Sequence, residues 1–352
     1  IYTEEDINII SKQLDFLDSI PLPKQRSKEW YEFRNNRLTA SDLGTVIGNN
    51  PYSSYKDLLL KKCGHEKPFI SGPAIQHGVK YEDVAVAIYE KRTNVTIKEY
   101  GCVPHPNVEF FGASPDGICS KNSENQQYVG RMLEIKCPKS RQLNGFVPDY
   151  YEAQVQGQLE VCELEYCDFL ECVIKEYNNK SEFLEDSLIE NNTKSLVNRK
   201  NNMEKGVLVE YFDLDENKSK FNYANIENLE NLELLEKWES DIIDNIMKSD
   251  NFEYIATNYW KLEEYSVILV KRDRDWFQEA YKNIEQFWND VLKYREEGID
   301  KIFEKYKKKE TKSSNKKTSS PKNKNYRKKK AKVVKAKVVK KVSNTGFLYD
   351  SN

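Results

Sequence analysis

A carboxylate and an ammonium group lie two residues apart in the segment Met132-Leu-Glu-Ile-Lys136. If this segment is a strand, alternation places Glu134 and Lys136 on one face and the apolar Leu133 and Ile135 on the other. Taken alone, the pair is most simply a solvated Glu–Lys pair on the surface of a strand.

Two further acidic residues weaken that simple interpretation. Asp116 lies in the tight turn Ala113-Ser-Pro-Asp-Gly117, and Glu134 follows it eighteen residues later, across a predicted hairpin. Glu82 lies on a helix predicted over residues 78–92, and an acidic residue on an apolar helix face is costly unless it has a partner. The other residues of that face are Val79, Val86 and Tyr89. Two interpretations of Glu82 follow. It is either a hydrogen-bonded glutamate of the core or a glutamate that contacts a metal-bound water.

Such a set of groups is typical of a metal-dependent nuclease. Carboxylate oxygens suit hard divalent ions such as Mg²⁺, at about 2.0–2.1 Å. One or two such ions can polarise a phosphodiester, lower the pKa of the attacking water and stabilise the leaving oxygen. Lys136 can orient or deprotonate that water or neutralise developing charge, and the carbonyl of Ile135 can add a ligand.

Hydrophobic patterning predicts the elements that must position these groups. An amphipathic helix is expected over residues 1–20 and ends before Pro21. Residues 27–65 are predicted to be helical, with a turn at 48–51. The predictions that follow along the chain are strands within 95–136 with a polar loop at 120–128, a helix over 149–163 and a strand over 166–177.

The rest of the chain divides into three stretches. Residues 178–251 are rich in Asn, Glu and Lys, and they predict two helices around one strand at 207–214, so we interpret them as an insertion. Residues 252–304 are dense in aromatic side chains, which are expected to belong to the core rather than to stack on bases. Residues 305–352 are predicted to form a disordered, lysine-rich tail.

The charge of the chain is unevenly distributed. Residues 305–341 hold 18 lysines or arginines and one acidic residue, although the whole chain of 352 residues has a net charge of −2. Such a stretch binds phosphates with a steep dependence on salt, and we favour nonspecific contact with nucleic acid. Arg327-Lys-Lys-Lys330 also fits a nuclear localisation signal, and a solubilising tail is the simplest alternative.

Composition limits the class of protein. The chain is 38% hydrophobic and 32% charged, and no stretch approaches the roughly 20 apolar residues of a membrane span. No signal peptide opens the sequence, and its seven cysteines are an odd number, widely spread, which favours reduced thiols over disulfides. We therefore expect a soluble, intracellular protein with no membrane partner.

The cysteines and histidines carry no convincing metal site. Cys162, Cys167 and Cys172, together with Cys137, would supply the four ligands of an iron–sulfur cluster. However, Cys162 falls on a predicted helix, and Cys167 and Cys172 face opposite sides of one strand, so buried thiols are favoured. The residues that lack zinc-site spacing are His65, His77 and His105.

The ordered set Glu82, Ser-Pro-Asp116-Gly and Glu134-Ile-Lys136 resembles the PD-(D/E)XK nuclease superfamily. Further motifs are similar to the YqaJ viral recombinase family, which includes the phage lambda-type exonuclease. These motifs are Trp30-x3-Arg34-x4-Thr39-Ala-Ser41-Asp42, Gln154-x3-Gln158, the Tyr259-Trp260 strand, Arg274-Asp-Trp276 and Phe287-Trp288. The resemblance covers about residues 27–177 and again 255–295. We therefore assign 27–177 to a nuclease core and 252–304 to a C-terminal part of that domain, after the N-terminal helix in residues 1–26 that the hydrophobic pattern predicts.

This resemblance implies an α/β fold of the restriction-endonuclease type, in which a central mixed sheet is flanked by helices. It also implies Mg²⁺- or Mn²⁺-dependent digestion of linear double-stranded DNA from 5′ to 3′, with release of mononucleotides. The residues implied to be catalytic are Glu82, Asp116, Glu134, Lys136, Gln154 and Gln158.

The resemblance further implies the roles of these residues. One or two metal ions would be bound by Asp116, Glu134 and the carbonyl of Ile135, with Glu82 acting directly or through water. Lys136 would be the catalytic lysine. The amides Gln154 and Gln158, one helical turn apart, would hold the nucleophilic water or the DNA backbone.

A pocket for a 5′ phosphate is also implied, because arginine offers a planar fork to phosphate oxygens. The candidates are Arg34, Ser41, Ser114 and Arg141. Ser41 can equally be the N-cap of the helix that follows it. Arg141 lies in a predicted loop, Lys139-Ser-Arg141.

The expected partner is a double-stranded DNA end, with a single-strand annealing protein and a homotrimeric ring as family-level expectations. Relatives in large DNA viruses would place the protein in a viral factory in the host cytoplasm or, through its basic tail, in the nucleus. Two alternatives keep the same fold. A structure-specific endonuclease would need no free end, and a non-catalytic DNA-binding scaffold would need no intact acids.

Overall fold

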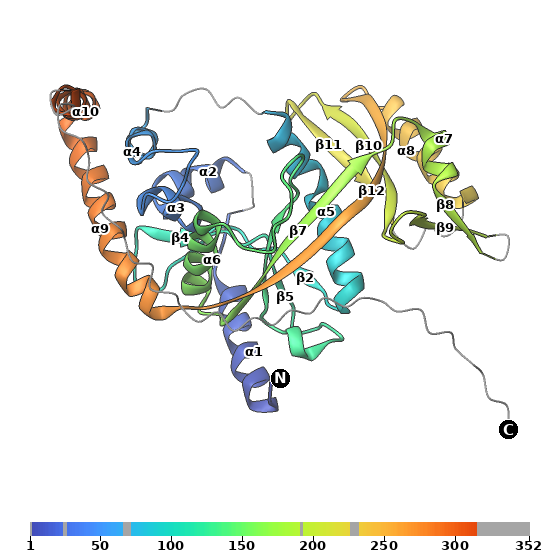
Figure 1. The fold of residues 1–352 in the computed structure, drawn as a ribbon, viewed down its shortest axis with the longest axis horizontal. Helices are drawn as coiled ribbons and strands as arrows, with labels where there is room; N and C mark the ends of the chain where they lie inside the picture. The colour runs from blue at the N-terminus through green and yellow to red at the C-terminus, as the bar shows by residue number, and fades with distance from the viewer. Residues whose placement is uncertain (1, 24–26, 66–71, 191–192, 226–231, 315–352) are drawn as a thin grey trace. The chain divides into compact units, whose positions relative to one another are not determined.

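The computed structural model describes residues 2–23, 27–65, 72–190, 193–225 and 232–314. Contacts divide the chain into one compact unit over residues 1–304 and a second over residues 305–352. Figure 1 shows the elements of the first unit in chain order. None of the helices in the described ranges is both long enough and apolar enough to cross a membrane.

A seven-stranded mixed sheet lies at the centre of the first unit, with the strand order β11-β10-β12-β7-β6-β5-β2 (Figure 1). β6 and β7 pair in parallel, whereas the other neighbours are antiparallel. The strands are β2 (Ile97–Lys98), β5 (Gly117–Cys119), β6 (Met132–Lys136), β7 (Tyr166–Glu176), β10 (Lys205–Asp213), β11 (Lys218–Tyr223) and β12 (Phe252–Lys271). This arrangement confirms the predicted mixed sheet.

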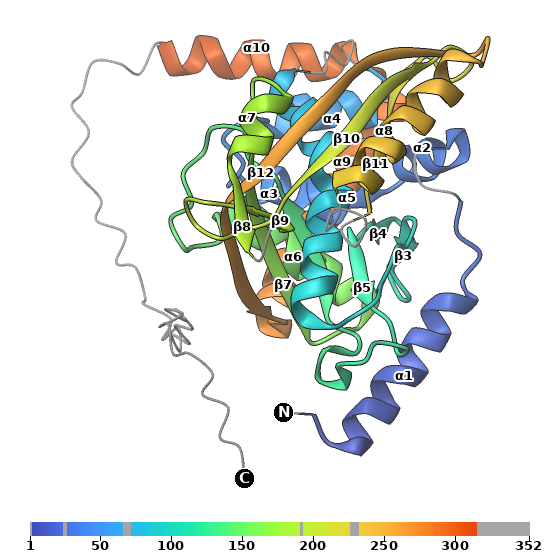
Figure 2. The same ribbon diagram turned by 90° about the vertical axis from the view of Figure 1, so that its right-hand side faces the viewer.

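Helices cover both faces of this sheet. Tyr81 of α5 belongs to the same buried cluster as Leu133 of β6, so α5 covers one face. On the other face, the ring of Tyr151 in α6 lies 5.7 Å from that of Phe169 in β7. Figure 2 shows α5 running across the strands. The two helices are α5 (Pro73–Thr93) and α6 (Asp149–Cys162).

A second, three-stranded sheet has the order β1-β4-β3. The stretch 27–65 is predicted to be helical, but Leu38 and Thr39 form strand β1 because they pair in parallel with Phe111 and Gly112 of β4. The other elements of this region are α2 (Lys28–Asn35), a 3₁₀ turn (Ala40–Asp42), α3 (Leu43–Val46), α4 (Tyr55–Lys62), β3 (Val103–Pro104) and β4 (Phe111–Ala113).

The remaining predicted boundaries are close to those observed. Helix α1 (Glu4–Ser19) ends before Pro21, and a 3₁₀ turn at Gln126–Tyr128 lies in the predicted polar loop. Helix α5 begins at Pro73 rather than at residue 78, because Pro73 occupies the first helical position, where its missing N–H costs nothing.

The stretch 178–251 contains more strand than its sequence predicts. Instead of one strand between two helices, the described residues of this stretch form four strands between α7 (Lys180–Glu185) and α8 (Leu232–Met247). β10 and β11 extend the central sheet, and β8 (Ser187–Glu190) pairs with β9 (Thr193–Asn198). β11 is missed because it begins with three consecutive polar residues, Lys218-Ser-Lys220, and is only partly buried.

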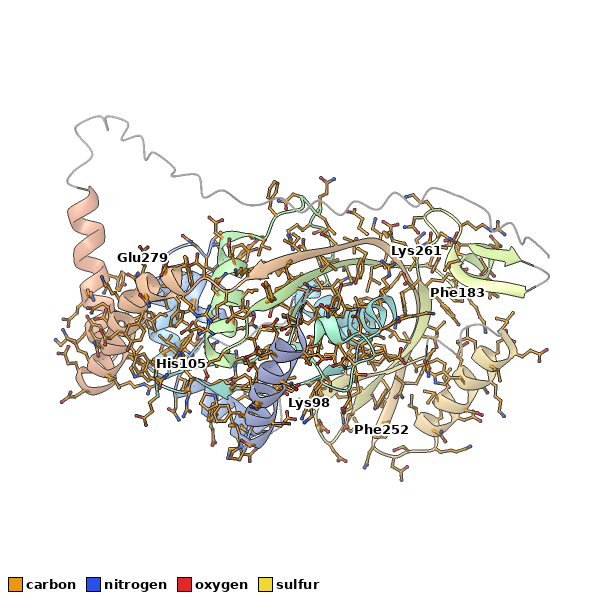
Figure 3. All side chains as sticks on the ribbon, turned by 90° about the horizontal axis from the view of Figure 1, so that it is seen from below. Lys98, His105, Phe183, Phe252, Lys261 and Glu279 are labelled. Atoms are coloured by element: carbon orange, nitrogen blue, oxygen red, sulfur yellow. The ribbon has the colours of Figure 1, made fainter. Side chains whose placement is uncertain are left out.

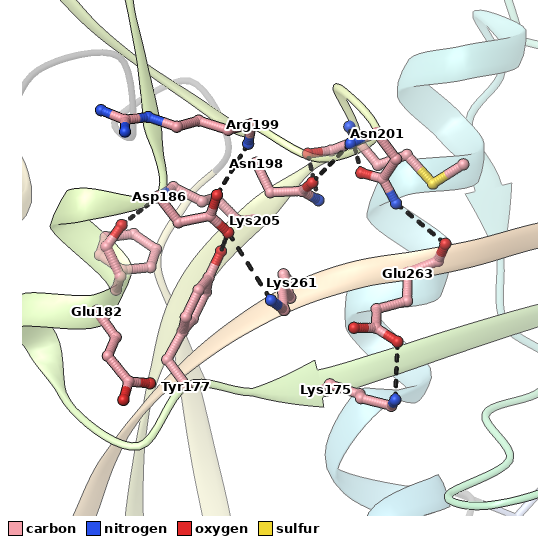
Figure 4. Close-up of polar contacts among 12 residues, drawn as sticks. Lys175, Tyr177, Glu182, Asp186, Asn198, Arg199, Asn201, Lys205, Lys261 and Glu263 are labelled. Carbon is pink, nitrogen blue, oxygen red and sulfur yellow. Dashed lines mark hydrogen bonds and ion pairs between the residues drawn. The ribbon is translucent and has the colours of Figure 1, made fainter.

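Polar contacts fasten this stretch to the central sheet (Figure 4). Asp186 accepts a hydrogen bond of 2.7 Å from Tyr177 and lies 3.8 Å from the ammonium of Lys261 in β12. Lys175 and Glu263 form an ion pair of 2.8 Å between β7 and β12.

The aromatic residues after β12 lie in the core, as predicted. Helix α9 (Arg274–Glu297) buries Phe277, Phe287 and Trp288. His105 stacks on Phe277, and Figure 3 shows it well away from Phe183 within the first unit.

The cysteines are buried thiols, as expected. Six of the seven are buried, and burial raises the pKa of the Cys162 and Cys172 thiols to about 12. Cys172 belongs to the cluster under α5, whereas Cys167 lies near Glu134 on the other side of β7.

The predicted disordered tail is wrong at its start. Helix α10 (Asp300–Ser314) continues through residues 305–314, where most positions are lysine or glutamate, which are good helix formers. The rest of the predicted tail lies outside the described residues.

Candidate active site

A cavity of about 200 Å³ lies where α6, the C-terminal end of β6 and the turn before β5 meet. It brings together most of the residues that the sequence singles out. Its lining consists of Trp30, Arg34, Ala40, Ser41, Glu82, Ser114, Asp116, Glu134, Lys136, Gln154 and Gln158.

Strand pairing fixes the two central carboxylates. β5 and β6 pair antiparallel with Gly117 opposite Leu133, which places Asp116, at the start of β5, beside the middle of β6. An oxygen of Asp116 accepts a hydrogen bond of 2.7 Å from the backbone N–H of Ile135. The predicted hairpin therefore brings Asp116 and Glu134 to the same cavity.

Glu134 is the most constrained side chain of the cavity. It is fully buried, and Gln154 and Gln158 each donate a hydrogen bond of 2.7 Å to one of its two oxygens. Lys136 donates to the same oxygen as Gln154. The two glutamines share one face of α6, as predicted. In this structure their amides are bonded to Glu134, whereas the resemblance implies that they hold the nucleophilic water or the DNA backbone.

Glu82 reaches the cavity from α5 by a route that differs from the prediction. The buried face of α5 consists of Tyr81, Val84, Ala85, Ile88 and Tyr89, so it is turned by about one residue from the expected face. Glu82 is therefore half-buried at the edge of that face, where it lines the cavity. Val79, expected to be buried beside it, is 39% exposed.

Burial and like charge shape the electrostatics of the site. Burial raises the pKa of Asp116 well above its usual value, and the negative charges of Glu134 and Glu82 raise it further. The pKa of Lys136 is raised because the attraction of Glu134 and Asp116 outweighs the effect of burial. Negative charge is therefore concentrated at the inner end of the cavity.

These residues fit a hard divalent cation. Asp116 and Glu134 offer carboxylate oxygens, and Oε1 of Gln158 is buried without a hydrogen-bond partner. Oxygen donors of this kind suit Mg²⁺ or Mn²⁺ rather than a soft metal. Over the described ranges, no group of three or more His, Cys, Asp or Glu side chains is already arranged to hold a metal ion.

The other end of the cavity is positively charged. Arg34 donates hydrogen bonds to the hydroxyls of Ser114 (2.9 Å) and Ser41 (3.4 Å), and its guanidinium lies over the Trp30 ring at 4.4 Å. Ser41 is not the N-cap of the helix that follows it, because the N-cap residue of α3 is Asp42 and that of the 3₁₀ turn is Thr39. Arg34, Ser41 and Ser114 are thus brought together as predicted.

A buried lysine that the sequence analysis missed holds Arg34 in place. Lys62 is 6% exposed, and its ammonium donates to the carbonyls of Arg34 (3.2 Å) and Arg37 (2.7 Å). It also forms an ion pair of 2.9 Å with Asp42. The available signal is its helical spacing, because Lys62 shares a face of α4 with the buried Leu58.

Arg141 lies elsewhere. It does not line the cavity, and its guanidinium forms an ion pair with the fully buried carboxylate of Glu171. Glu171 is the β7 residue paired with Lys136, so this ion pair is one strand away from the carboxylates. The structure therefore separates Arg141 from the three other predicted phosphate ligands.

Comparison with known proteins finds similarity to one family model and to viral proteins. Residues 29–165 match the YqaJ-like viral recombinase domain. An uncharacterized protein of Acanthamoeba polyphaga mimivirus is 35% identical over 326 residues, which cover 86% of this chain and 59% of that protein. A protein of African swine fever virus (strain Badajoz 1971 Vero-adapted) is 29% identical over 160 residues, covering 39% of this chain and 46% of that one. The chain thus spans about half the length of the curated relatives it matches.

Among solved structures, this chain is similar to LHK-Exo in complex with dAMP, with a TM-score of 0.42 and 18% identity over 80% of this chain and 99% of that one. It is also similar to a phage-related exonuclease from Haemophilus somnus 129PT, with a TM-score of 0.37 and 13% identity over 76% and 99%. The sequence match over residues 29–165 includes the cavity residues from Arg34 to Gln158. Over residues 29–165, the chain is therefore similar to YqaJ-like viral recombinase domains.

Proposed function

We propose that this protein is a deoxyribonuclease that hydrolyses linear double-stranded DNA from its 5′ ends, with Mg²⁺ or Mn²⁺ as cofactor. The observation that carries the proposal is the convergence of Asp116, Glu134 and Lys136 on one cavity that also holds Arg34. The YqaJ-like domain supports this proposal, because the name links it to viral recombination. Recombination, replication or repair of viral DNA are the processes in which such an activity would act.

Asp116 and Glu134, with the carbonyl of Ile135 and with Glu82 directly or through water, would hold the divalent ion. Once bound, the ion would polarise the scissile phosphate and lower the pKa of the attacking water. The two glutamines fix the rotamer of Glu134, so its oxygens face the cavity before substrate arrives. Lys136 places an ammonium beside Glu134, where it can stabilise negative charge on the phosphate in the transition state.

The positively charged end of the cavity supports a preference for DNA ends. Arg34 presents a guanidinium fork next to two serine hydroxyls, a donor set that suits a terminal phosphate. A terminal phosphate held there would fix the distance between the DNA end and the carboxylates. An internal phosphodiester has no such group to offer. We therefore place the 5′ phosphate on Arg34, Ser41 and Ser114, and we leave Arg141 out of that pocket.

The test is digestion of a duplex labelled at its 5′ ends, beside a closed circular duplex of the same sequence. We expect loss of the linear DNA alone, with early release of 5′ nucleotides, in Mg²⁺ or Mn²⁺ but not in EDTA. Cleavage of the circle would show an endonuclease on the same fold. Tight binding without cleavage in any metal would indicate a non-catalytic scaffold and would contradict the proposal.

Assembly is a separate question within this proposal. A homotrimeric ring around DNA would explain processive digestion, and an annealing protein would receive the single strand that remains. Size-exclusion chromatography with light scattering tests the trimer directly. A monomeric mass in the presence of DNA would exclude the ring without affecting the hydrolytic site.

A further inference from the structure

Three tyrosines form a continuous row of rings that begins at the active-site lysine. The Nζ of Lys136 lies 4.6 Å from the centre of the Tyr151 ring. The rings of Tyr151 and Tyr150 are 4.3 Å apart, and the Tyr150 ring is 5.8 Å from that of Tyr52, at nearly a right angle. We call Tyr52, Tyr150 and Tyr151 the tyrosine row.

The row leads from the cavity toward solvent. Tyr150 and Tyr151 lie at the start of α6, one helical turn before Gln154, which lines the cavity. Tyr150 and Tyr151 are half-buried, whereas Tyr52 is 82% exposed. An aromatic side chain exposed to this degree gains little from the hydrophobic core, so packing does not explain its position.

Close contacts hold the row in place. A Cβ atom added to Gly44 of α3 would lie 2.8 Å from the Cβ of Tyr150, so the absence of a side chain lets α3 touch α6 there. The segment leading to Tyr52 is fastened by two contacts of Asn50. Its amide donates to Thr45 (2.9 Å), and its carbonyl oxygen accepts from the backbone N–H of Tyr52 (2.9 Å).

We propose that the tyrosine row is a stacking surface for unpaired nucleobases of the DNA strand next to the scissile phosphate. This inference rests on the proposed nuclease function and names the part of the substrate that binds outside the cavity. Every base has a π face, so aromatic rings bind bases without sequence preference, which suits an enzyme that must digest any sequence. The cation of Lys136 at the inner end would meet the phosphate that follows the last stacked base.

Tyr52 is the side chain to change, because its exposure allows substitution without loss of the fold. The probe is a 5′-phosphorylated duplex with 2-aminopurine in a short unpaired 5′ end, mixed with the protein in Ca²⁺ to limit cleavage. Stacking on a ring quenches the fluorescence of this base. We expect the wild type and Tyr52→Phe to quench the fluorescence of the probe. We expect Tyr52→Leu to bind the probe about tenfold more weakly, that is, with a Kd about tenfold higher.

The matched control is Tyr254→Leu, because Tyr254 is 39% exposed and lies on β12, away from the residues of the cavity. It should bind and digest DNA as the wild type does. In Mg²⁺, Tyr52→Leu should raise KM for the duplex more than it lowers kcat.

Two results would overturn the inference in distinguishable ways. If the wild type digests DNA and Tyr52→Leu binds the probe with unchanged affinity and quenching, the stacking surface is wrong while the nuclease stands. If the wild type neither binds nor digests the duplex, the proposed function fails and the stacking surface with it.

Discussion

Glu134 shows how much of this site depends on hydrogen bonds rather than on the acids alone. Its two oxygens receive three donors, from Gln154, Gln158 and Lys136, in a position with no solvent contact. A buried carboxylate without such donors would be strongly destabilising. The glutamines therefore satisfy the buried oxygens of Glu134 at the place where a metal ion would need them.

Arg34 should decide how the protein distinguishes a phosphorylated end from a hydroxyl end. Its guanidinium is shared between two serines and can offer charge-assisted hydrogen bonds to a terminal phosphate. We expect the wild type to digest 5′-phosphorylated duplex about 10- to 100-fold faster than 5′-hydroxyl duplex, as the strength of such bonds predicts. Arg34→Ala should remove most of that ratio, which is measured from initial rates on the two substrates.

Arg141 provides the control for this experiment. Because its guanidinium pairs with Glu171 outside the cavity, Arg141→Ala should leave the ratio unchanged. A loss of phosphate preference in Arg141→Ala, with Arg34→Ala unaffected, would show that the two arginines have been assigned the wrong roles.

The sequence locates the acids and the lysine well but not their surroundings. Asp116, Glu134 and Lys136 follow from a turn and from strand alternation, which are local properties. Lys62 and the ion pair of Arg141 depend on contacts between elements far apart in the chain, which residue spacing does not encode. The face of α5 was displaced by about one residue, because Tyr81 and Val84 pack against β6 in preference to Val79.

Among the elements, α6 positions the largest share of the side chains discussed above. It supplies both glutamines that bind Glu134 and two rings of the tyrosine row. It lies close to the 3₁₀ turn that holds Ser41, and Gly157 makes this approach possible. A Cβ atom at Gly157 would lie 2.6 Å from a methyl group of Leu43 and 3.1 Å from the Cβ of Ala40.

Gly157→Ala should therefore destabilise the protein, although alanine has a higher helix propensity than glycine. In an open helix this change stabilises by about 1 kcal/mol. Here we expect a lower melting temperature and a loss of nuclease activity, because α6 must move away from Ala40. Differential scanning calorimetry measures the first effect. A raised melting temperature would show that the contact has room to relax.

The ion pair of Lys62 and Asp42 joins α4 to the turn before α3 and should be visible in the acid stability of the fold. Burial by itself raises the pKa of Asp42, but the charge of Lys62 and hydrogen bonds from Thr39 outweigh it, so the pKa lies below its usual value. The stabilisation is therefore present above the unfolded-state pKa of about 3.9 and is lost as the pH falls through the lower folded-state pKa.

We expect Asp42→Asn to flatten the pH dependence of the free energy of unfolding below about pH 4. Lys62→Met, which leaves Asp42 buried without its cation, should cost about 3–5 kcal/mol near neutral pH. Urea unfolding at several pH values measures both. If the free energy of unfolding of Asp42→Asn falls as steeply with decreasing pH as that of the wild type, the pair contributes nothing to stability.

Element types were predictable from the sequence wherever the pattern was strong. Helices α1 and α6 and strand β7 lie close to their expected positions. The strands of 178–251 were mostly missed, because their alternation is weak and their pairing partners include β12, distant in sequence.

Taken over its full length, the chain combines an acidic body with a basic C-terminal stretch. The lysines and arginines of 305–341 number 18 against one acidic residue, whereas the net charge of the chain is −2. A nuclease of this kind needs positive charge to approach DNA, and this stretch is the part of the sequence richest in it.

Removal of residues 315–352 should therefore weaken DNA binding and flatten its salt dependence, because fewer counterions are released per bound duplex. Turnover at saturating DNA should persist, since no cavity residue is removed. Fluorescence anisotropy at 50–300 mM salt gives the binding constant, and hence the slope of its logarithm against the logarithm of the salt concentration. The same slope in the shortened and full chains would assign the stretch to targeting or spacing instead.

The central claim is that the cavity around Glu134 and Lys136 hydrolyses DNA. The most direct test measures nucleotide release from a linear 5′-phosphorylated duplex in Mg²⁺ by the wild type, Glu134→Gln and Lys136→Ala, with binding of the same duplex measured in Ca²⁺. We predict that both variants remain folded and bind DNA, while release falls by about 10²- to 10³-fold, the range seen when a principal transition-state group is removed. Variants that release nucleotides at the wild-type rate would contradict this assignment and place the chemistry elsewhere.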